Sequence, residues 1–216
     1  MLKKIKLKNS TSILIGIIII TIGVAIGLYE YFEERKNKTF SDMNIVLYEK
    51  EQPKNLETSE DISNDDLTIN NREEQENTLA NESVQINYLG ILEIPKINLK
   101  KGFFGLDSPY NGVDYNITVI NGSTFPTEEN NNLILAAHSG DCPVCYFEDL
   151  YKLKLGDKAY LDYNNTKYSY KIVDIYTVEK DGTVTIYRDY KKSVLTLITC
   201  TRNSDTKQTV YILEEI

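Results

Sequence analysis

The chain has 216 residues and a mass of 24.8 kDa, which suffices for one domain of ordinary size with additional segments. Apolar residues make up 41% of it, so a wholly disordered chain is excluded. The 32 acidic and 24 basic side chains give a formal charge of −8. This balance argues against nucleic-acid binding, which requires a basic face that displaces counterions from phosphates. Three cysteines are too few for a disulfide-stapled scaffold, and the single histidine is the only possible site of histidine chemistry.

The N-terminal segment has the pattern of a membrane anchor. Residues 13–29 form an apolar run without a charge, and Tyr31 and Phe32 extend it. At about 1.5 Å per residue, a helix over residues 13–32 spans a bilayer. Four lysines precede the run: Lys3, Lys4, Lys6 and Lys8. The positive-inside rule therefore places residues 1–12 in the cytoplasm and the rest of the chain outside. A cleaved signal peptide is the less favoured alternative, because no small-x-small pattern follows the run.

The next segment is acidic and poor in apolar residues. Residues 30–83 carry 15 acidic and 6 basic side chains, a net charge of −9. The isolated apolar residues in it cannot bury enough surface to offset the conformational entropy of the chain. We therefore predict an extracellular stalk over residues 33–83, with the helix of the anchor continuing as far as Tyr48. A spacer that holds the following domain away from the membrane is favoured over an acidic binding tail.

Residues 84–216 consist of short strand-like runs separated by turn residues. Seven runs stand out: residues 89–94, 115–120, 133–137, 158–163, 168–176, 194–199 and 209–213. Only residues 147–155 have a helical pattern, and no glycine-rich phosphate loop is present. We expect about eight strands at this spacing, which predicts an all-β domain, either a small barrel or a sandwich.

The two residues that could carry out catalysis each follow a predicted strand. His138 directly follows the apolar run LILAA of residues 133–137, and Cys200 directly follows LTLIT of residues 195–199. A cysteine nucleophile reacts as its thiolate, and a nearby histidine manages the protons of the reaction. Each residue alone also has a structural explanation, since an isolated buried cysteine behaves as a small hydrophobic side chain.

Taken together, these segments closely resemble a sortase. The resemblance rests on IPKI at 94–97, NLILAAHSG at 132–140, Phe147, Leu150, Leu153, Gly156-Asp157 and TLITC at 196–200, in this order. It covers about residues 88–216, and the anchor and outward orientation also agree with that family. The resemblance implies an eight-stranded β-barrel with short helices, carried outside a Gram-positive cell membrane by a single-pass anchor.

The resemblance also implies an activity. Sortases are cysteine transpeptidases that cut an LPXTG-like sorting signal of surface proteins and join the product to an amine. Cys200 would form a thioacyl intermediate, and His138 would donate a proton to the leaving amine and later accept one from the incoming amine. The acceptor would be an amine of a peptidoglycan precursor or of a pilin. No cofactor is implied; calcium, which some relatives bind, would have only Glu128-Glu129 as a weak indication.

One position departs from the sortase pattern. Sortases carry an arginine at the start of the last strand, where a cation stabilises the oxyanion and orients the substrate. Here Gln208 stands at that place, beside Lys207, and the nearest arginine is Arg202, two residues after Cys200. We predict that Arg202 supplies the cation, with Lys207 or Gln208 as substitutes.

A second departure is the CPVC segment of residues 142–145, which follows His138. An oxidising extracellular setting favours a dithiol or a disulfide that stiffens the histidine loop. Two unrelated buried thiols are an alternative. A zinc site made of His138, Cys142, Cys145 and Cys200 is a third, and it would consume both catalytic groups.

Other functions compete with the enzyme. A membrane-anchored binding or adhesion module, in which the barrel persists and the chemistry has lapsed, is favoured by the missing late arginine. A thiol–disulfide enzyme built on Cys142 and Cys145 is disfavoured, because no βαβ pattern surrounds the pair. The 18 residues 177–194 are short for the inserted helix of class B sortases, and no Asp-Pro-aromatic lid motif indicates an autoinhibited pilin polymerase. The sortase class therefore stays open.

Overall fold

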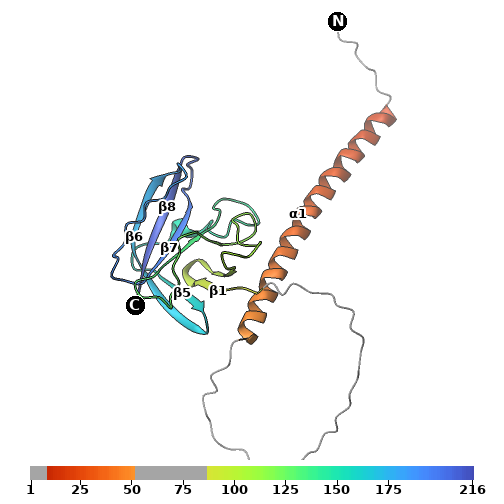
Figure 1. Ribbon diagram of the computed structural model, residues 1–216. Coiled ribbons are helices and arrows are strands. Elements are labelled where there is room, and N and C mark those ends of the chain that lie inside the picture. The colour runs from red at the N-terminus through yellow and green to blue at the C-terminus, as the bar shows by residue number, and fades with distance from the viewer. Residues whose placement is uncertain (1–8, 52–86) are drawn as a thin grey trace, which may run out of the picture.

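The computed structural model of the protein describes residues 9–51 and 87–216 (Figure 1). It begins with a long helix, α1 (Asn9–Glu51), which is the one helix of the described residues that is long and apolar enough to cross a membrane. The helix passes Tyr48 without a break, so residues 33–51 of the predicted stalk are helical. The predicted segments over residues 1–8 and 52–83 lie outside the described residues.

The rest of the described chain is a single eight-stranded sheet that curls into a nearly closed barrel. Its strands are β1 (Gly90–Ile94), β2 (Leu99–Phe103), β3 (Thr118–Val119), β4 (Asn132–Ala136), β5 (Lys158–Tyr163), β6 (Thr166–Glu179), β7 (Val194–Cys200) and β8 (Lys207–Glu215). Their order in the sheet is β2-β1-β5-β6-β8-β7-β4-β3, and a bridge between Phe103 and Ile117 connects its two ends. Two 3₁₀ turns, η1 (Pro95–Ile97) and η2 (Leu150–Lys152), complete it. The predicted all-β barrel of about eight strands is confirmed.

The structure differs from the predicted elements in three places. Strand β2 was not expected, because its sequence LKKGF has two lysines and a glycine in place of an alternating apolar pattern. The strand expected over residues 115–120 is reduced to the two residues of β3. The helical pattern of residues 147–155 yields only the three-residue turn η2, since Phe147, Leu150 and Leu153 bury themselves in the barrel core without forming a regular helix.

Strand β7 is buried on both faces, which explains its continuous apolar sequence. Leu195 and Leu197 point into the barrel core. Val194 and Ile198 join a second cluster on the outside, together with residues of β4 and β8. Val184 and Ile186, from the connection between β6 and β7, pack against this outer cluster. The connection therefore lies over the outer face of the sheet next to the strand that ends in Cys200.

The C-terminal part of α1 packs against the barrel (Figure 1). Ile45 of the helix lies in a buried cluster with Tyr88, Ile91 and Phe104. The hydroxyl of Tyr88 donates a hydrogen bond to Ser41 Oγ at 3.5 Å, and the Tyr48 hydroxyl donates to the carbonyl of Asp162 at 3.3 Å. An ion pair of 2.7 Å joins Lys100 of β2 to Glu49. The interpretation of residues 33–83 as a solvated spacer did not include this contact.

Beside this junction, Lys101 of β2 is buried, and no acidic side chain of the described residues forms an ion pair with it. Its side chain is only 8% exposed, and its Nζ lies 4.1 Å from the centroid of the Tyr146 ring. Within residues 9–51 and 87–216, no hydrogen bond or ion pair reaches this ammonium. Burial lowers the pKa of Lys101 to about 8, although the charge of Asp42 acts in the opposite direction.

We expect Lys101→Met to raise the free energy of unfolding by about 2 kcal/mol at pH 7. The lowered pKa corresponds to a cost of roughly 3 kcal/mol for burying the charge, from which the lost cation–π contact subtracts about 1 kcal/mol. Because the folded pKa lies below the unfolded one, the unfolded chain binds more protons between about pH 8 and 10.5. The wild type therefore gains stability as the pH rises through this window, and the advantage of the variant shrinks.

The measurement is denaturant unfolding of the full chain in detergent micelles at pH 7 and pH 10. Lys100→Met is the matched control, since Lys100 is half exposed and its pair with Glu49 contributes about 0–1 kcal/mol. A Lys101→Met variant no more stable than the wild type at pH 7 would contradict the expected penalty.

Candidate active site

Strands β4 and β7 bring His138 and Cys200 to the same end of the barrel. They pair in parallel, with Ala136 opposite Ile198 at the end of the register. The contact with β7 continues one residue beyond β4, since the Ala137 N–H donates to the carbonyl of Ile198 at 3.3 Å and the Thr199 hydroxyl donates to the carbonyl of Ala137 at 2.9 Å. His138 follows β4 and Cys200 ends β7, so both predicted residues emerge at one edge. Strand ends of this kind combine a rigid backbone with side chains that reach solvent.

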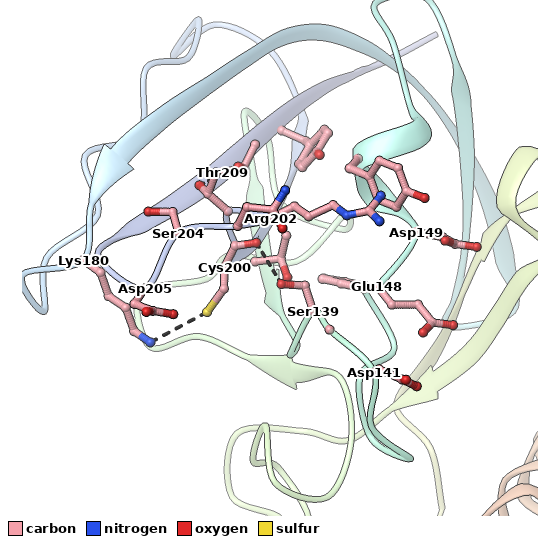
Figure 2. A pocket seen from close by; sticks show the side chains of 17 residues that line it. Ser139, Asp141, Glu148, Asp149, Lys180, Cys200, Arg202, Ser204, Asp205 and Thr209 are labelled. Atoms are coloured by element: carbon pink, nitrogen blue, oxygen red, sulfur yellow. Dashed lines mark hydrogen bonds between the residues drawn. The ribbon is translucent and has the colours of Figure 1, made fainter.

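Cys200 lies in a pocket of about 750 Å³ (Figure 2). The thiol is partly exposed, and Cys200 is the one free cysteine among the described residues. The pocket walls come from the loop after β4, the turn η2, the residue after β6 and the loop between β7 and β8. Besides Cys200, the polar residues that line the pocket are Ser139, Asp141, Glu148, Asp149, Tyr151, Lys180, Thr199, Thr201, Arg202, Asn203, Ser204, Asp205, Thr209 and Tyr211. The pocket has the size of a small-ligand site and presents the thiol to solvent.

Two contacts hold Cys200 in this pocket, and Figure 2 shows both. The Ser139 hydroxyl donates a hydrogen bond to the Cys200 carbonyl at 2.8 Å, which ties the loop after His138 to the end of β7. The Lys180 Nζ lies 3.7 Å from the Cys200 Sγ and donates to it. Lys180 could not be recognised from the sequence, because a lysine just past a strand has no local signal. Only the pairing of β6 with β8 and of β8 with β7 carries it to Cys200.

The imidazole of His138 is directed to a different neighbour. Its Nε2 lies 3.4 Å from Asp114 Oδ1, and the Asp114 side chain is 83% exposed. The His138 carbonyl accepts a hydrogen bond from the Phe147 N–H at 3.0 Å, which fixes the backbone of the loop. Over the described residues, no hydrogen bond joins the His138 ring to Cys200, and His138 is not among the residues that line the pocket. The fold thus brings the two residues to one edge without bonding their side chains.

Comparison with known proteins identifies the family. A family model described as "Sortase domain" matches residues 92–214, more than half of the chain. The chain belongs to the sortase family. It is 27% identical over 188 residues to Sortase A of Bacillus anthracis, covering 85% of this chain and 83% of that one. Members of this family are cysteine transpeptidases that anchor proteins bearing an LPXTG signal.

Solved sortases share the fold. Sortase C-1 from Actinomyces oris is 22% identical with a TM-score of 0.53, and the match covers 62% of this chain and 78% of that one. The Clostridium perfringens Sortase D5 transpeptidase is 21% identical with a TM-score of 0.51, over 60% and 79% of the two chains. The similar sortases are of classes A, C and D, so the similarity singles out no class.

In this sortase the predicted cation, Arg202, lines the pocket but does not contact the thiol. Its guanidinium carbon lies 4.1 Å from the centroid of the Tyr151 ring, and Figure 2 shows the side chain running along the wall away from the Sγ. Of the two substitutes, Lys207 forms an ion pair with Glu179 at 3.8 Å. Gln208 pairs with Cys200 across β7 and β8. The cation in contact with the Sγ is therefore Lys180 and none of the three predicted residues.

The CPVC segment forms a disulfide between Cys142 and Cys145. The predicted dithiol or disulfide is thus found as the disulfide. The interpretations as unrelated buried thiols and as a zinc site are wrong, because both sulfurs are consumed by the S–S bond. The bond closes a small ring in the loop after His138 and restricts its conformations. The described ranges contain no group of three or more side chains arranged as metal ligands, and Glu128 caps the Phe125 N–H at 2.9 Å.

Proposed function

We propose that this sortase cleaves an LPXTG-like sorting signal through a thioacyl intermediate on Cys200 and transfers the product to an amine. The observation that supports the proposal most is the free Cys200 thiol, partly exposed at the end of β7 in a pocket of about 750 Å³. We further propose that α1 anchors the chain in the membrane, with residues 1–12 in the cytoplasm and the barrel outside. The acceptor is an amine of a peptidoglycan precursor or of a pilin.

The proposed reaction has two halves. In the first, the Cys200 thiolate attacks the carbonyl carbon before the scissile bond, and the C–N bond breaks as His138 gives a proton to the leaving amine. In the second, the incoming amine attacks the thioester carbonyl and passes a proton to His138, and the Cys200 thiolate leaves. Protons and charges balance over the cycle, which returns His138 and Cys200 to their initial states.

His138 has to turn toward Cys200 for this role. Its present contact with Asp114 is long and lies at the surface, where water screens the interaction. Little free energy therefore opposes a rotation of the ring when a substrate fills the pocket. Catalytic hydrogen bonds of unliganded enzymes are often absent or long and form only with substrate bound.

Arg202 keeps a proposed role in the same pocket. Its guanidinium is held against the Tyr151 ring, where its N–H groups can donate to carbonyl oxygens of a bound peptide. We propose that Arg202 orients the sorting signal rather than the thiolate.

The test is covalent capture. The full chain in detergent micelles is incubated with a library of sorting-signal peptides, and intact mass followed by peptide mapping locates an acyl adduct. We expect an adduct on Cys200 that disappears when triglycine or a lysine peptide is added. No adduct with any peptide, from a folded chain whose thiol reacts with a methanethiosulfonate, would overturn the proposal and favour a binding or adhesion module. The feature that favours this second function is Gln208 opposite Cys200.

A further inference from the structure

The Cys200 thiol has one cationic neighbour, and the other cations near this end of the barrel are engaged elsewhere. Arg202 stacks on Tyr151, and Lys207 pairs with Glu179. Across the residues that the structure describes, only Lys180 places its charge on the sulfur, at 3.7 Å. A residue on the opposite strand, where sortases carry arginine, cannot replace it here because the amide of Gln208 is neutral.

The fold holds Lys180 in this place through its backbone. Lys180 follows the last residue of β6, and its N–H donates to the carbonyl of Thr206 at 2.7 Å, directly before β8 begins. The chain after it folds over the outer face of β7 and β8. There the Tyr176 hydroxyl donates to the Thr185 carbonyl at 2.9 Å. The backbone of Lys180 and the chain that follows it are therefore held in place, although the ammonium is exposed to solvent.

We propose that Lys180 is a catalytic residue that supplies the cation of this active site. Its ammonium pairs with the Cys200 thiolate before the reaction. When the thiolate attacks the carbonyl carbon of the substrate, the ammonium then donates a hydrogen bond to the oxyanion of the tetrahedral intermediate, whose oxygen lies two bonds from the sulfur. This inference rests on the proposed function.

The chemistry of an ammonium suits this double role. A lysine has three donors on a flexible stem, so it can shift from sulfur to oxygen without moving its backbone. No proton has to leave Lys180 at any step, because both partners are anions that the intact ammonium stabilises. Opposite unit charges at about 4 Å in a high dielectric attract each other by about 1 kcal/mol, which favours the thiolate over the thiol by about 5-fold. The attraction becomes stronger when a substrate displaces water from the pocket.

The first experiment measures thiol reactivity in the full chain, which needs no sorting signal. Cys142 and Cys145 are joined in a disulfide, so without reductant a single alkylation reports on Cys200. The neutral reagent iodoacetamide and the anionic reagent iodoacetate are compared at pH 7. We expect Lys180→Met to slow iodoacetamide about 5-fold and iodoacetate more strongly. Lys180→Arg should restore most of both rates, and 0.5 M salt should reduce the difference between wild type and Lys180→Met.

Two variants serve as controls for the origin of the charge. Lys207→Met should leave both alkylation rates within about 2-fold of the wild type, because its cation lies at Glu179. Arg202→Met tests the alternative source of the charge, and we expect it to slow alkylation less than Lys180→Met does, because its guanidinium lies at Tyr151. Unchanged rates in Lys180→Met would overturn the inference. A slowing in Arg202→Met in place of Lys180→Met would assign the cation to Arg202 instead.

The second experiment separates this inference from the proposed function. Single-turnover acylation with a sorting-signal peptide should fall in Lys180→Met by more than alkylation does, since the oxyanion contact is lost in addition to the thiolate contact. Equal acylation rates in both proteins would overturn the catalytic role. If the wild type forms no acyl adduct while Lys180→Met still slows alkylation, the ion pair stands and the transpeptidase proposal fails.

Discussion

Replacing Cys200 by alanine is expected to abolish cleavage of a sorting signal, by more than about 10⁴-fold, and to remove the acyl adduct. The thiol is the one group of the pocket that can form a thioester, and the other two cysteines are joined to each other. Stability should change by less than about 1 kcal/mol, because the side chain is partly exposed at the end of β7. Peptide cleavage and thermal unfolding of the same sample test both statements.

Cys200→Ser is the matched variant, since it keeps the shape of the side chain. A hydroxyl is a much weaker nucleophile than a thiolate at neutral pH. Among the described residues of the pocket, no general base accepts a hydrogen bond from the side chain at position 200. We therefore expect Cys200→Ser to be as inactive as Cys200→Ala. Turnover that survives in both variants would mean that the chemistry takes place elsewhere in the chain.

The two strands that carry the site were predictable from the sequence. Their pairing with each other was not predictable from the residue pattern alone. Apolar runs before His138 and Cys200 indicate two buried strands, which the structure confirms as β4 and β7. Their parallel pairing joins residues 62 positions apart, and no periodicity contains that information. The proximity of His138 and Cys200 was therefore predictable only from the resemblance to sortases.

The cation in contact with the thiol could not be predicted from the sequence, because its position depends on tertiary structure. Arg202 is close to Cys200 in sequence, but an arginine in a loop takes the direction that its neighbours stabilise, here the Tyr151 ring. Lys180 is 20 residues away and reaches the thiol through the order β6-β8-β7 in the sheet. The long strand β6 extends beyond the residues with an obvious strand pattern and carries Lys180 to the active-site end.

The packing of α1 on the barrel also depends on tertiary structure and could not be predicted from the local sequence. Ile45 and Tyr48 are the ends of a short apolar run, residues 45–48, in a charged stretch, and a stretch of this composition usually stays solvated. The barrel offers them a partner face around Tyr88 and Ile91, which would otherwise be exposed. This face becomes visible only when β1 and β2 are folded together, so the sequence of the stretch itself does not indicate it.

Replacing His138 by glutamine is expected to slow turnover by about 10²–10⁴-fold without unfolding the barrel. Glutamine retains a hydrogen-bonding side chain of similar size, but it neither gives nor takes a proton. Because His138 serves both halves of the proposed reaction, acylation by a peptide and release by an amine should both slow. Rapid-quench measurement of each half, with intact mass as the readout, tests this directly.

Asp114→Asn shows whether the observed contact of His138 is part of catalysis or a resting position. The Asp114 carboxylate is mostly exposed, so its interaction with the ring is worth about 0–1 kcal/mol, a factor of about 5 at most. We expect Asp114→Asn to change turnover by no more than that factor. A loss as large as that of His138→Gln would show that Asp114 orients the imidazole during the reaction. Near-normal turnover in His138→Gln would instead remove the imidazole from the mechanism and leave proton transfer to water.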